Sequence, residues 1–294
     1  MSDTLQMQIA LKSSPDAILR AWTEELPAWF AEHADISLAD KRYDFWGRYT
    51  PETPDRESGH HPLLTHEEGK KLSFGWHLSK EDRTIQIDVQ PRDDQQIVAI
   101  QVTKPAYEDF WFLSLENLRR HLDGKAPVRC DYSQSMLGDI HHTIEIEASR
   151  ESVYDTLIKP EQLDRWIASH ATVEPRVGGT YDWGWGGTGT MPMKILELVP
   201  NESLKLSGIH DGVESILMWT LAESNGKTRL TMVHSGFAPD KDTGMTTGWL
   251  NFMSWVKSIS EYGNDWQPAI LRISSDAVSF YPASIGKGQA VLIP

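Results

Sequence analysis

An internal repeat is the feature that most constrains how this chain can fold. Ser14 stands before an expected helix that begins at Pro15, and Ser149 stands before a second expected helix, 135 residues later. A serine in that place can accept a hydrogen bond from a first-turn N–H group. A proline in the first turn costs no hydrogen bond, because the N–H group that it lacks would have no partner within the helix. Trp29 and Trp166 follow in the same order, 137 residues apart. The repeated anchors predict two copies of one domain.

Further anchors continue in order along both halves of the chain. A triplet with two aromatic residues, Tyr43-Asp44-Phe45, matches Tyr181-Asp182-Trp183. Two strand residues, Leu72 and Phe74, match Leu204 and Leu206. The apolar stripe of a long helix also recurs, with Trp111, Phe112, Leu115 and Leu118 matching Trp249, Leu250, Met253 and Val256. The stripe has the i, i+1, i+4, i+7 spacing of an amphipathic helix. We predict a first domain over 1–126 with an inserted loop at 50–68, a second domain over 136–263, and a tail over 264–294.

The order of elements in the second copy predicts an α+β fold. Residues 140–146 alternate apolar and polar, as in a half-buried strand. Two short helices are expected at 149–158 and 160–168, then five strands between 180 and 234, and finally a long helix at 243–262. A curved antiparallel sheet must cover its concave face, and this helix can do so. Incomplete filling between helix and sheet would leave a ligand pocket.

Composition narrows the classes of partner. The chain has 42 Asp and Glu against 28 Lys and Arg, a formal net charge of -14, which disfavours nucleic acid and anionic membranes. The single Cys130 allows no intrachain disulfide and no cysteine metal cluster. No apolar run approaches the roughly 18 residues of a membrane span, and the first residues do not resemble a signal peptide. We therefore expect a cytoplasmic protein.

Several segments of the second copy are specific as a set. They are 140–148, Gly178-Gly179-Thr180-Tyr181, 195–200, Trp219-Thr220-Leu221 and 228–237. Together they resemble the activator of Hsp90 ATPase homologue 1-like (AHSA1-like) family of the START-like, or SRPBCC, superfamily. The resemblance implies a helix-grip (Bet v 1-like) fold, in which a curved antiparallel sheet wraps around a long C-terminal helix and encloses an apolar cavity. Combined with the internal repeat, it predicts two such START-like domains in tandem. It implies no particular reaction, because the superfamily includes transporters, lipid carriers, cyclases and co-chaperones.

Aromatic and thioether side chains of the second copy are the candidate lining of such a cavity. Trp183 and Trp185 are two apart on an expected strand and would share one face. Tryptophan offers stacking area, methionine adapts to varied ligands, and His234 could hold a ligand's polar end. The predicted ligand-binding residues are Trp166, Tyr181, Trp183, Trp185, Met193, Trp219, His234, Trp249, Phe252 and Met253. The alternative is that they fill a packed core.

Two other motifs are weaker. The inserted loop gathers histidines and glutamates (His60, His61, His66, Glu57, Glu67 and Glu68), which suit zinc or nickel in principle. Their spacing matches no strong metal signature and the loop is expected to be solvated, so we predict no metal and no cofactor. The glycine-rich run 184–189 precedes an expected strand instead of a helix, which favours a rim or turn over a phosphate cradle.

Three functions remain open from the sequence. The leading hypothesis is a non-enzymatic protein that binds a small hydrophobic or aromatic molecule. The second is a co-chaperone-like adaptor that stimulates an Hsp90-type ATPase, although no counterpart of the eukaryotic co-chaperone's separate N-terminal domain is found. The third is a cavity enzyme, a cyclase or hydrolase, with His234 or Asp182 as acid or base. No catalytic motif is recognised, and a homo-oligomer stays open.

Overall fold

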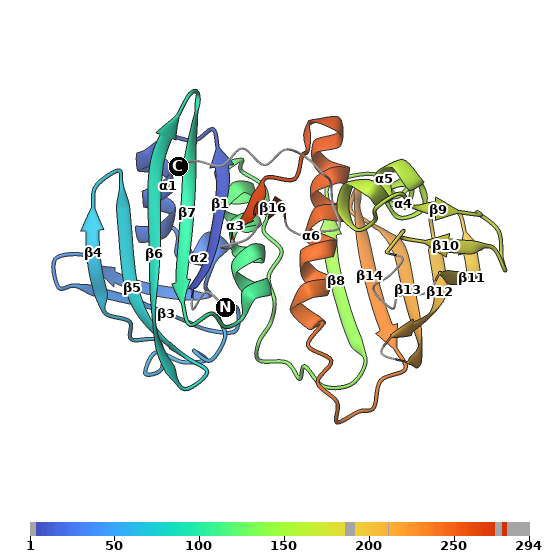
Figure 1. Ribbon diagram of the computed structural model, residues 1–294, viewed down its shortest axis with the longest axis horizontal. Coiled ribbons are helices and arrows are strands. Elements are labelled where there is room, and N and C mark those ends of the chain that lie inside the picture. Colours follow the sequence, from blue (N-terminus) through green and yellow to red (C-terminus); the bar gives the residue numbers. More distant parts are fainter. Residues whose placement is uncertain (1–3, 186–191, 211, 274–277, 281–294) are drawn as a thin grey trace. The chain divides into compact units, whose positions relative to one another are not determined.

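The computed structural model describes residues 4–185, 192–210, 212–273 and 278–280 (Figure 1). These residues fall into two compact units, each considered by itself below. The first unit contains residues 4–135 together with 269–273 and 278–280, and the second contains the described residues between 136 and 268. Within the described segments, no helix is both long and apolar enough to cross a bilayer.

The first unit is a seven-stranded antiparallel sheet with three helices. Its elements are β1 (Thr4–Leu11), α1 (Pro15–Thr23), α2 (Leu26–Trp29), β2 (His33–Ser37), β3 (Arg42–Trp46), β4 (Leu63–Glu67), β5 (Lys71–Leu78), β6 (Glu81–Arg92), β7 (Gln95–Thr103), α3 (Glu108–Leu122), β15 (Ile270–Ile273) and β16 (Val278–Phe280). The strand order is β16-β15-β1-β7-β6-β5-β4, and β2 and β3 form a separate hairpin. Helix α3 packs against β1 and against helices α1 and α2.

The second unit has the same kind of architecture. Its elements are β8 (Ile140–Ile146), α4 (Arg150–Ile158), α5 (Pro160–Trp166), β9 (Thr172–Val173), β10 (Thr180–Asp182), β11 (Met193–Val199), β12 (Ser203–His210), β13 (Val213–Ser224), β14 (Lys227–Ser235), α6 (Thr246–Tyr262) and the 3-10 turn η1 (Gly263–Asp265). The strand order is β8-β14-β13-β12-β11-β10-β9. The α+β class and the large antiparallel sheets are therefore confirmed.

The two sheets pair their strands in the same register. Leu72 pairs with Ile87 in the first unit, and Leu204 pairs with Trp219 in the second. Both residues of the second pair lie 132 positions after their counterparts in the first pair. An irregularity in register also recurs at the same place, next to Leu63 on β4 and next to Ile195 on β11. Because a slip of one residue would turn every side chain to the other face, this agreement fixes matching inner faces in the two units.

Side-chain caps and buried hydrogen bonds recur as well. Ser14 accepts from the N–H of Ala17 at 3.2 Å, and Ser149 accepts from the N–H of Ser152 at 3.2 Å. The Trp29 indole donates to the Ala21 carbonyl at 3.0 Å, as the Trp166 indole donates to the Thr156 carbonyl at 2.9 Å. The phenols of the two repeated tyrosines also each donate to a helix carbonyl, Tyr43 to Trp22 and Tyr181 to Leu157. The helix starts and the anchors read from the sequence therefore make equivalent contacts.

Some predicted boundaries were wrong. The strand expected to run from 180 through Trp185 ends at Asp182, because the Asp182 carboxylate accepts from the N–H of Gly184 at 2.8 Å and closes a turn. Gly184 has a φ of +72°, and a Cβ there would meet the Ser169 carbonyl oxygen at 1.8 Å. The last helix begins at Thr246 instead of 243. Residues 186–189 of the predicted glycine-rich rim or turn, and residues 281–294 of the predicted tail, lie outside the described residues.

The C-terminal segment completes the first sheet. Strand β15 pairs antiparallel with β1, so that Ile9 faces Ile270 and Gln6 faces Ile273 (Figure 1). Ile270 is only 2% exposed and belongs to the core of the first unit. The described part of the predicted tail, beyond Pro268, therefore packs on the first unit.

Ending the chain at Pro268 is therefore expected to lower the free energy of unfolding of the first unit by about 2–4 kcal/mol. The truncation exposes the apolar surface that Ile270 covers and leaves the edge of β1 unpaired. Thermal unfolding with amide hydrogen exchange of β1 would measure the loss. A chain ending at Ile273, which keeps β15, is the control, and equal stability of the two truncations would contradict the prediction.

Candidate functional site

Most of the predicted ligand-binding side chains of the second unit lie together between helix α6 and the sheet. Ring contacts link them in a chain: Trp166 to Trp219 at 6.3 Å between ring centroids, Trp219 to Trp249 at 5.9 Å, Trp249 to Phe252 at 5.7 Å, Trp183 to Trp249 at 6.4 Å, Trp183 to Trp185 at 4.9 Å and Tyr181 to Trp183 at 6.4 Å. Helices α5 and α6, strands β10 and β13, and the turn after β10 all contribute. This set is called the aromatic cluster below.

The two predicted methionines are placed differently. Met193 on β11 approaches β12, where a Cβ built on Gly208 would lie 3.4 Å from its side chain. Met253 is fully buried on α6. Both methionines thus belong to the interior of the second unit.

Burial differs across the aromatic cluster. Trp166, Tyr181 and Trp219 are at most 2% exposed, whereas Trp185 and Phe252 are only half-buried. The Trp183 and Trp185 rings touch because the turn at Gly184 brings them together, not because they share the face of a strand. The cluster therefore has a fully buried part, and Trp185 and Phe252 form its half-buried part.

A chain of hydrogen bonds crosses the cluster. The Trp249 indole N–H donates to Nδ1 of His234 at 3.1 Å, and Nε2 of His234 lies 3.1 Å from the Ser215 hydroxyl. Since an indole only donates, Nδ1 must be the acceptor and Nε2 of the neutral ring carries the proton. His234 then donates to Ser215, so the Ser215 hydroxyl does not donate its own proton to the imidazole.

This arrangement decides how His234 can act. A general base for Ser215 would need an unprotonated Nε2, and the Trp249 contact places the lone pair on Nδ1 instead. Asp182, the other acid or base considered, accepts from the Gly184 N–H in its turn. The printed contacts of His234 are those of an orienting network, and His234 and Asp182 are not brought onto one point by the hydrogen bonds that they make.

Ser215 was not predicted from the sequence. It lies on β13 opposite Gly208 of β12 and is 5% exposed. The only sequence signal was indirect: Ser215 is two residues before Leu217, which faces His234 across the sheet, so its side chain lies on the same face as Leu217. An isolated serine at the start of a strand is too common to single out.

The three histidines of the inserted loop lie in different surroundings. His60 pairs with Asp44, its Nδ1 2.8 Å from Oδ2, while His61 lies in the core and His66 is exposed on β4. The expectation of a wholly solvated loop was wrong, because His61 is 3% exposed with its ring 4.1 Å from that of Phe45. In the described parts of the chain, no group of three or more His, Cys, Asp or Glu side chains could hold a metal ion.

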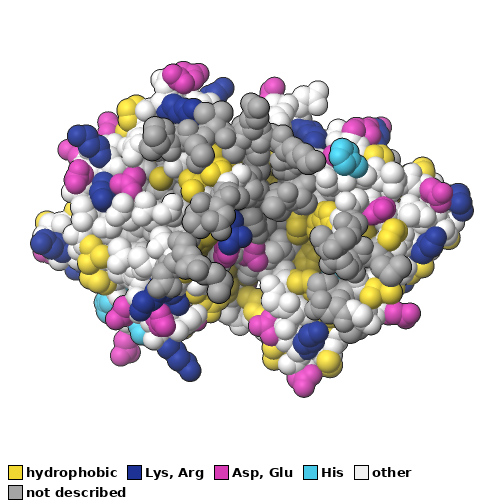
Figure 2. Space-filling model, in the orientation of Figure 1, with side chains coloured by type: hydrophobic (Ala, Val, Ile, Leu, Met, Phe, Trp, Pro, Cys, Tyr) yellow, Lys and Arg dark blue, Asp and Glu magenta, His cyan; other side chains and the backbone are white. Residues whose placement is uncertain are grey.

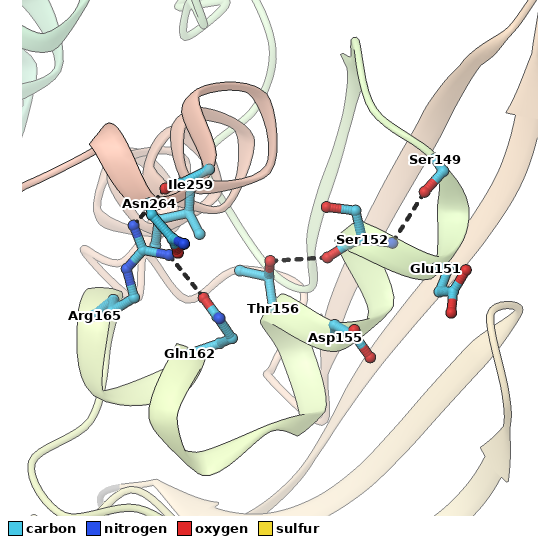
Figure 3. Close-up of a pocket in the computed structure, with 10 residues that line it drawn as sticks. Ser149, Glu151, Ser152, Asp155, Thr156, Gln162, Arg165, Ile259 and Asn264 are labelled. Carbon is cyan, nitrogen blue, oxygen red and sulfur yellow. Dashed lines mark hydrogen bonds between the residues drawn. The ribbon is translucent and has the colours of Figure 1, made fainter.

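A separate polar pocket of about 280 Å³ opens beside α4 and α5 (Figure 3). Arg165 points toward its inner end and donates to Oε1 of Gln162 at 2.8 Å, and also to the backbone carbonyls of Gly263 and Trp266. Asp155 at the outer side is held by Lys159 at 2.6 Å. Arg165 and Asp155 are thus engaged by other groups of the protein, and Arg165 holds the chain at the end of α6. We therefore assign this pocket a structural role and take the aromatic cluster as the candidate site.

Comparison with known proteins gives a family match within the second unit. The family model described as activator of Hsp90 ATPase homolog 1-like protein matches residues 147–260. No curated protein matches the chain. Among solved structures, the Aha1 dimer from Colwellia psychrerythraea is 25% identical, covers 43% of this chain and 98% of its own, and has a TM-score of 0.38.

Two further solved structures are similar at lower identity. An HSP90 activator from Plasmodium falciparum is 17% identical over 42% of this chain and 95% of its own, with a TM-score of 0.35. DynU16, a protein of the dynemicin biosynthetic locus, is 12% identical over 88% of this chain and 97% of its own, with a TM-score of 0.34. The family-model match therefore identifies an AHSA1-like domain within the second unit, over residues 147–260.

Proposed function

We propose that the second unit binds a small hydrophobic or aromatic molecule between α6 and the sheet. The observation that carries this is the hydrogen-bond chain from Trp249 through His234, in which the Ser215 hydroxyl does not donate its own proton to the imidazole. A ligand ring would stack against Trp185 and Phe252, which are half-buried. Its polar end would be a hydrogen-bond acceptor, such as a carbonyl, held by Ser215.

We also propose that the two units are tandem helix-grip domains that arose by duplication. The equal strand registers, the recurring register irregularity and the two matched tryptophan hydrogen bonds support this. Each unit has one long helix that follows its run of consecutive strands, α3 after β7 in the first and α6 after β14 in the second, and each helix packs against its own sheet. Chance convergence would not reproduce register and hydrogen bonds together.

The binding proposal is tested with two matched probes, 2-acetonaphthone and 2-ethylnaphthalene, which differ by a carbonyl. Both should quench the tryptophan fluorescence of the full chain, and the ketone should bind about fivefold more tightly, since one neutral hydrogen bond is worth about 1 kcal/mol. Ser215→Ala should remove that preference.

Ser207→Ala, on the neighbouring strand β12, is the matched control, because Ser207 faces Ile216 and makes no part of the His234 network. It should keep the native preference for the ketone. Quenching by neither probe, or a ketone preference that survives in Ser215→Ala, would overturn the proposal.

A second candidate is a co-chaperone-like adaptor, which the family-model match over 147–260 favours. On the face that Figure 2 shows, acidic and basic side chains are interspersed, so docking on that face would rest on local charge pairs. An ATPase assay with the host Hsp90 tests this function separately. Stimulation that persists in Ser215→Ala would assign the activity to the surface, and no stimulation would remove the candidate.

A further inference from the structure

The second sheet has an open edge at the position where the first sheet carries an additional strand. Strand β1 lies between β7 and β15, whereas its counterpart β8 pairs with β14 alone among the described strands (Figure 1). The counterparts follow from the register. Ile9 pairs with Val98 on β7, and Ile144 pairs with Leu230 on β14, 135 and 132 positions later. An open edge presents N–H and C=O groups to any strand that can pair with it.

Burial beside this edge differs between the two units. In the first unit, Ile9 pairs with Ile270 of β15 and is only 1% exposed. In the second unit, the matching Ile144 is only half-buried. An apolar side chain of the second unit thus stays partly in water where the first unit places its additional strand. Covering that side chain would remove apolar surface from water, which favours pairing along the edge.

His141, Thr143 and Glu145 direct their backbone groups to the open edge. The Thr143 and Thr231 hydroxyls lie 3.0 Å apart across the strands, the close approach of a pair that shares no backbone hydrogen bonds. The backbone of Thr143 therefore points away from β14, and alternation gives His141 and Glu145 the same direction. Lys257 of α6 agrees with this, because its ammonium group donates to the Glu145 carbonyl. The side chains of His141, Thr143 and Glu145 are all exposed.

This edge is complementary to itself. In two antiparallel β8 strands centred on Thr143, His141 of each copy stands opposite Glu145 of the other, so an imidazole faces a carboxylate. The hydroxyl and guanidinium groups near Glu145 both approach its Oε1, so Oε2 can accept from that imidazole. His141, Thr143 and Glu145 of each copy then exchange backbone hydrogen bonds with the same three residues of the other. The two Ile144 side chains become diagonal neighbours.

The neighbouring registers lack this match. Moving the centre to residue 142 places Glu145 opposite Asp139 of the other copy, and like charges directly opposite are destabilising. Moving the centre to residue 144 places His141 opposite Glu147 and requires the backbone N–H of Glu147. That N–H already donates to the Glu261 carboxylate at 2.9 Å. The pairing centred on Thr143 is therefore favoured.

We propose that the open edge of β8 binds β8 of a second copy of this chain, antiparallel and centred on Thr143. The twofold pairing joins the second-unit sheets of two copies into one continuous sheet. The dimer is weak and reversible, because exposed hydrogen bonds replace bonds to water and each copy carries a formal charge of -14. It does not depend on the ligand binding proposed above.

Sedimentation equilibrium of the full chain at about 0.15 M salt, which screens the repulsion, is the first test. The weight-average mass should rise about 1.5-fold from about 5 to about 200 µM, as for a dimer of weak affinity. In Thr143→Pro the mass should stay at 33.3 kDa. The lost N–H points to the open edge, so the pairing of β8 with β14 is kept. Ser215→Ala should dimerise like the native chain.

Cross-linking tests the register without relying on the proline variant. Paired Thr143 residues would have Cα atoms about 5.5 Å apart, within the range of a disulfide, so Thr143→Cys should form a dimer on mild oxidation. Cys130, the chain's other cysteine there, is 3% exposed. His141→Cys and Glu145→Cys are matched controls on the same strand. Neither should cross-link alone, because equivalent residues lie about 13 Å apart, but a mixture of the two chains should.

A mass that does not change with concentration would overturn the proposal, as would dimerisation that persists in a folded Thr143→Pro chain. Cross-linking of His141→Cys alone as readily as Thr143→Cys would contradict the register and the proposal with it. A chain ending at Phe280 should dimerise as the full chain does. Dimerisation by that shorter chain alone would assign the edge of β8 to residues 281–294 of the same chain and would equally overturn the proposal.

Discussion

Replacing Trp166 with alanine is expected to destabilise the second unit by about 3–5 kcal/mol, and replacing Trp29 should do the same to the first unit. Each indole is at most 1% exposed and donates to a carbonyl of the preceding helix, that of Thr156 or of Ala21. The substitution leaves a cavity and also removes the donor from a buried carbonyl. Amide hydrogen exchange, read separately for β14 and β7, would assign each loss to its unit.

The conservative variants separate the two contributions. Trp166→Phe and Trp29→Phe keep most of the ring and lose the hydrogen bond, so they should cost clearly less than the alanine variants. Because the two tryptophans make matching contacts, the ratio of phenylalanine to alanine effects should be similar in both units. A Trp29→Ala chain in which β14 loses protection as much as β7 would show that the units do not unfold independently.

Acid is expected to weaken the first unit through His61. Its pKa falls from an ordinary 6.5 to about 4, chiefly because burial penalises the charged ring; the Asp44 carboxylate partly offsets this, and His60 adds to it. Above pH 6.5 the ring is neutral in both states. Between pH 6.5 and 4 the His61 ring binds a proton in the unfolded chain but not in the folded unit. The free energy of unfolding therefore falls by up to about 3 kcal/mol.

Urea unfolding between pH 7 and 4 would measure this dependence, with His61→Leu as the comparison. In the variant, the contribution of His61 to the pH dependence of the free energy of unfolding should disappear, whatever the variant's stability at pH 7. His142 provides a check in the second unit, because burial also lowers its pKa while it bonds to the Thr246 carbonyl. An unchanged slope for the first unit in His61→Leu would mean that other groups, such as its carboxylates, govern the acid response.

The sequence predicted the elements that depend on local signals. Ser14 and Ser149 marked two helix starts, and both serines cap their helices as expected. The paired tyrosines and tryptophans were recognised because large side chains repeat in order. Most of the candidate ligand residues meet in one cluster for the same reason, since alternation along strands and the helical stripe place them on inner faces.

What the sequence did not show depends on contacts between distant segments. Ser215 became relevant only once the register placed it beside His234. His61 sits in a loop whose composition is typical of a solvated surface, yet its ring packs against Phe45 and Trp76. Trp183 and Trp185 were grouped correctly for the wrong reason, because the turn at Gly184 depends on its close approach to Ser169. Nothing local to these residues encodes such contacts.

The pairing of β15 with β1 has a consequence for the order in which the protein can assemble. The partner strands are Thr4–Leu11 and Ile270–Ile273, and residues 136–268, which contain all the described helices and strands of the second unit, are encoded between them. During translation the ribosome must finish the second unit before it can release the strand that completes the first sheet. The part of the chain made first is therefore the last to reach its final structure, with the edge of β1 open to strand pairing in the interval.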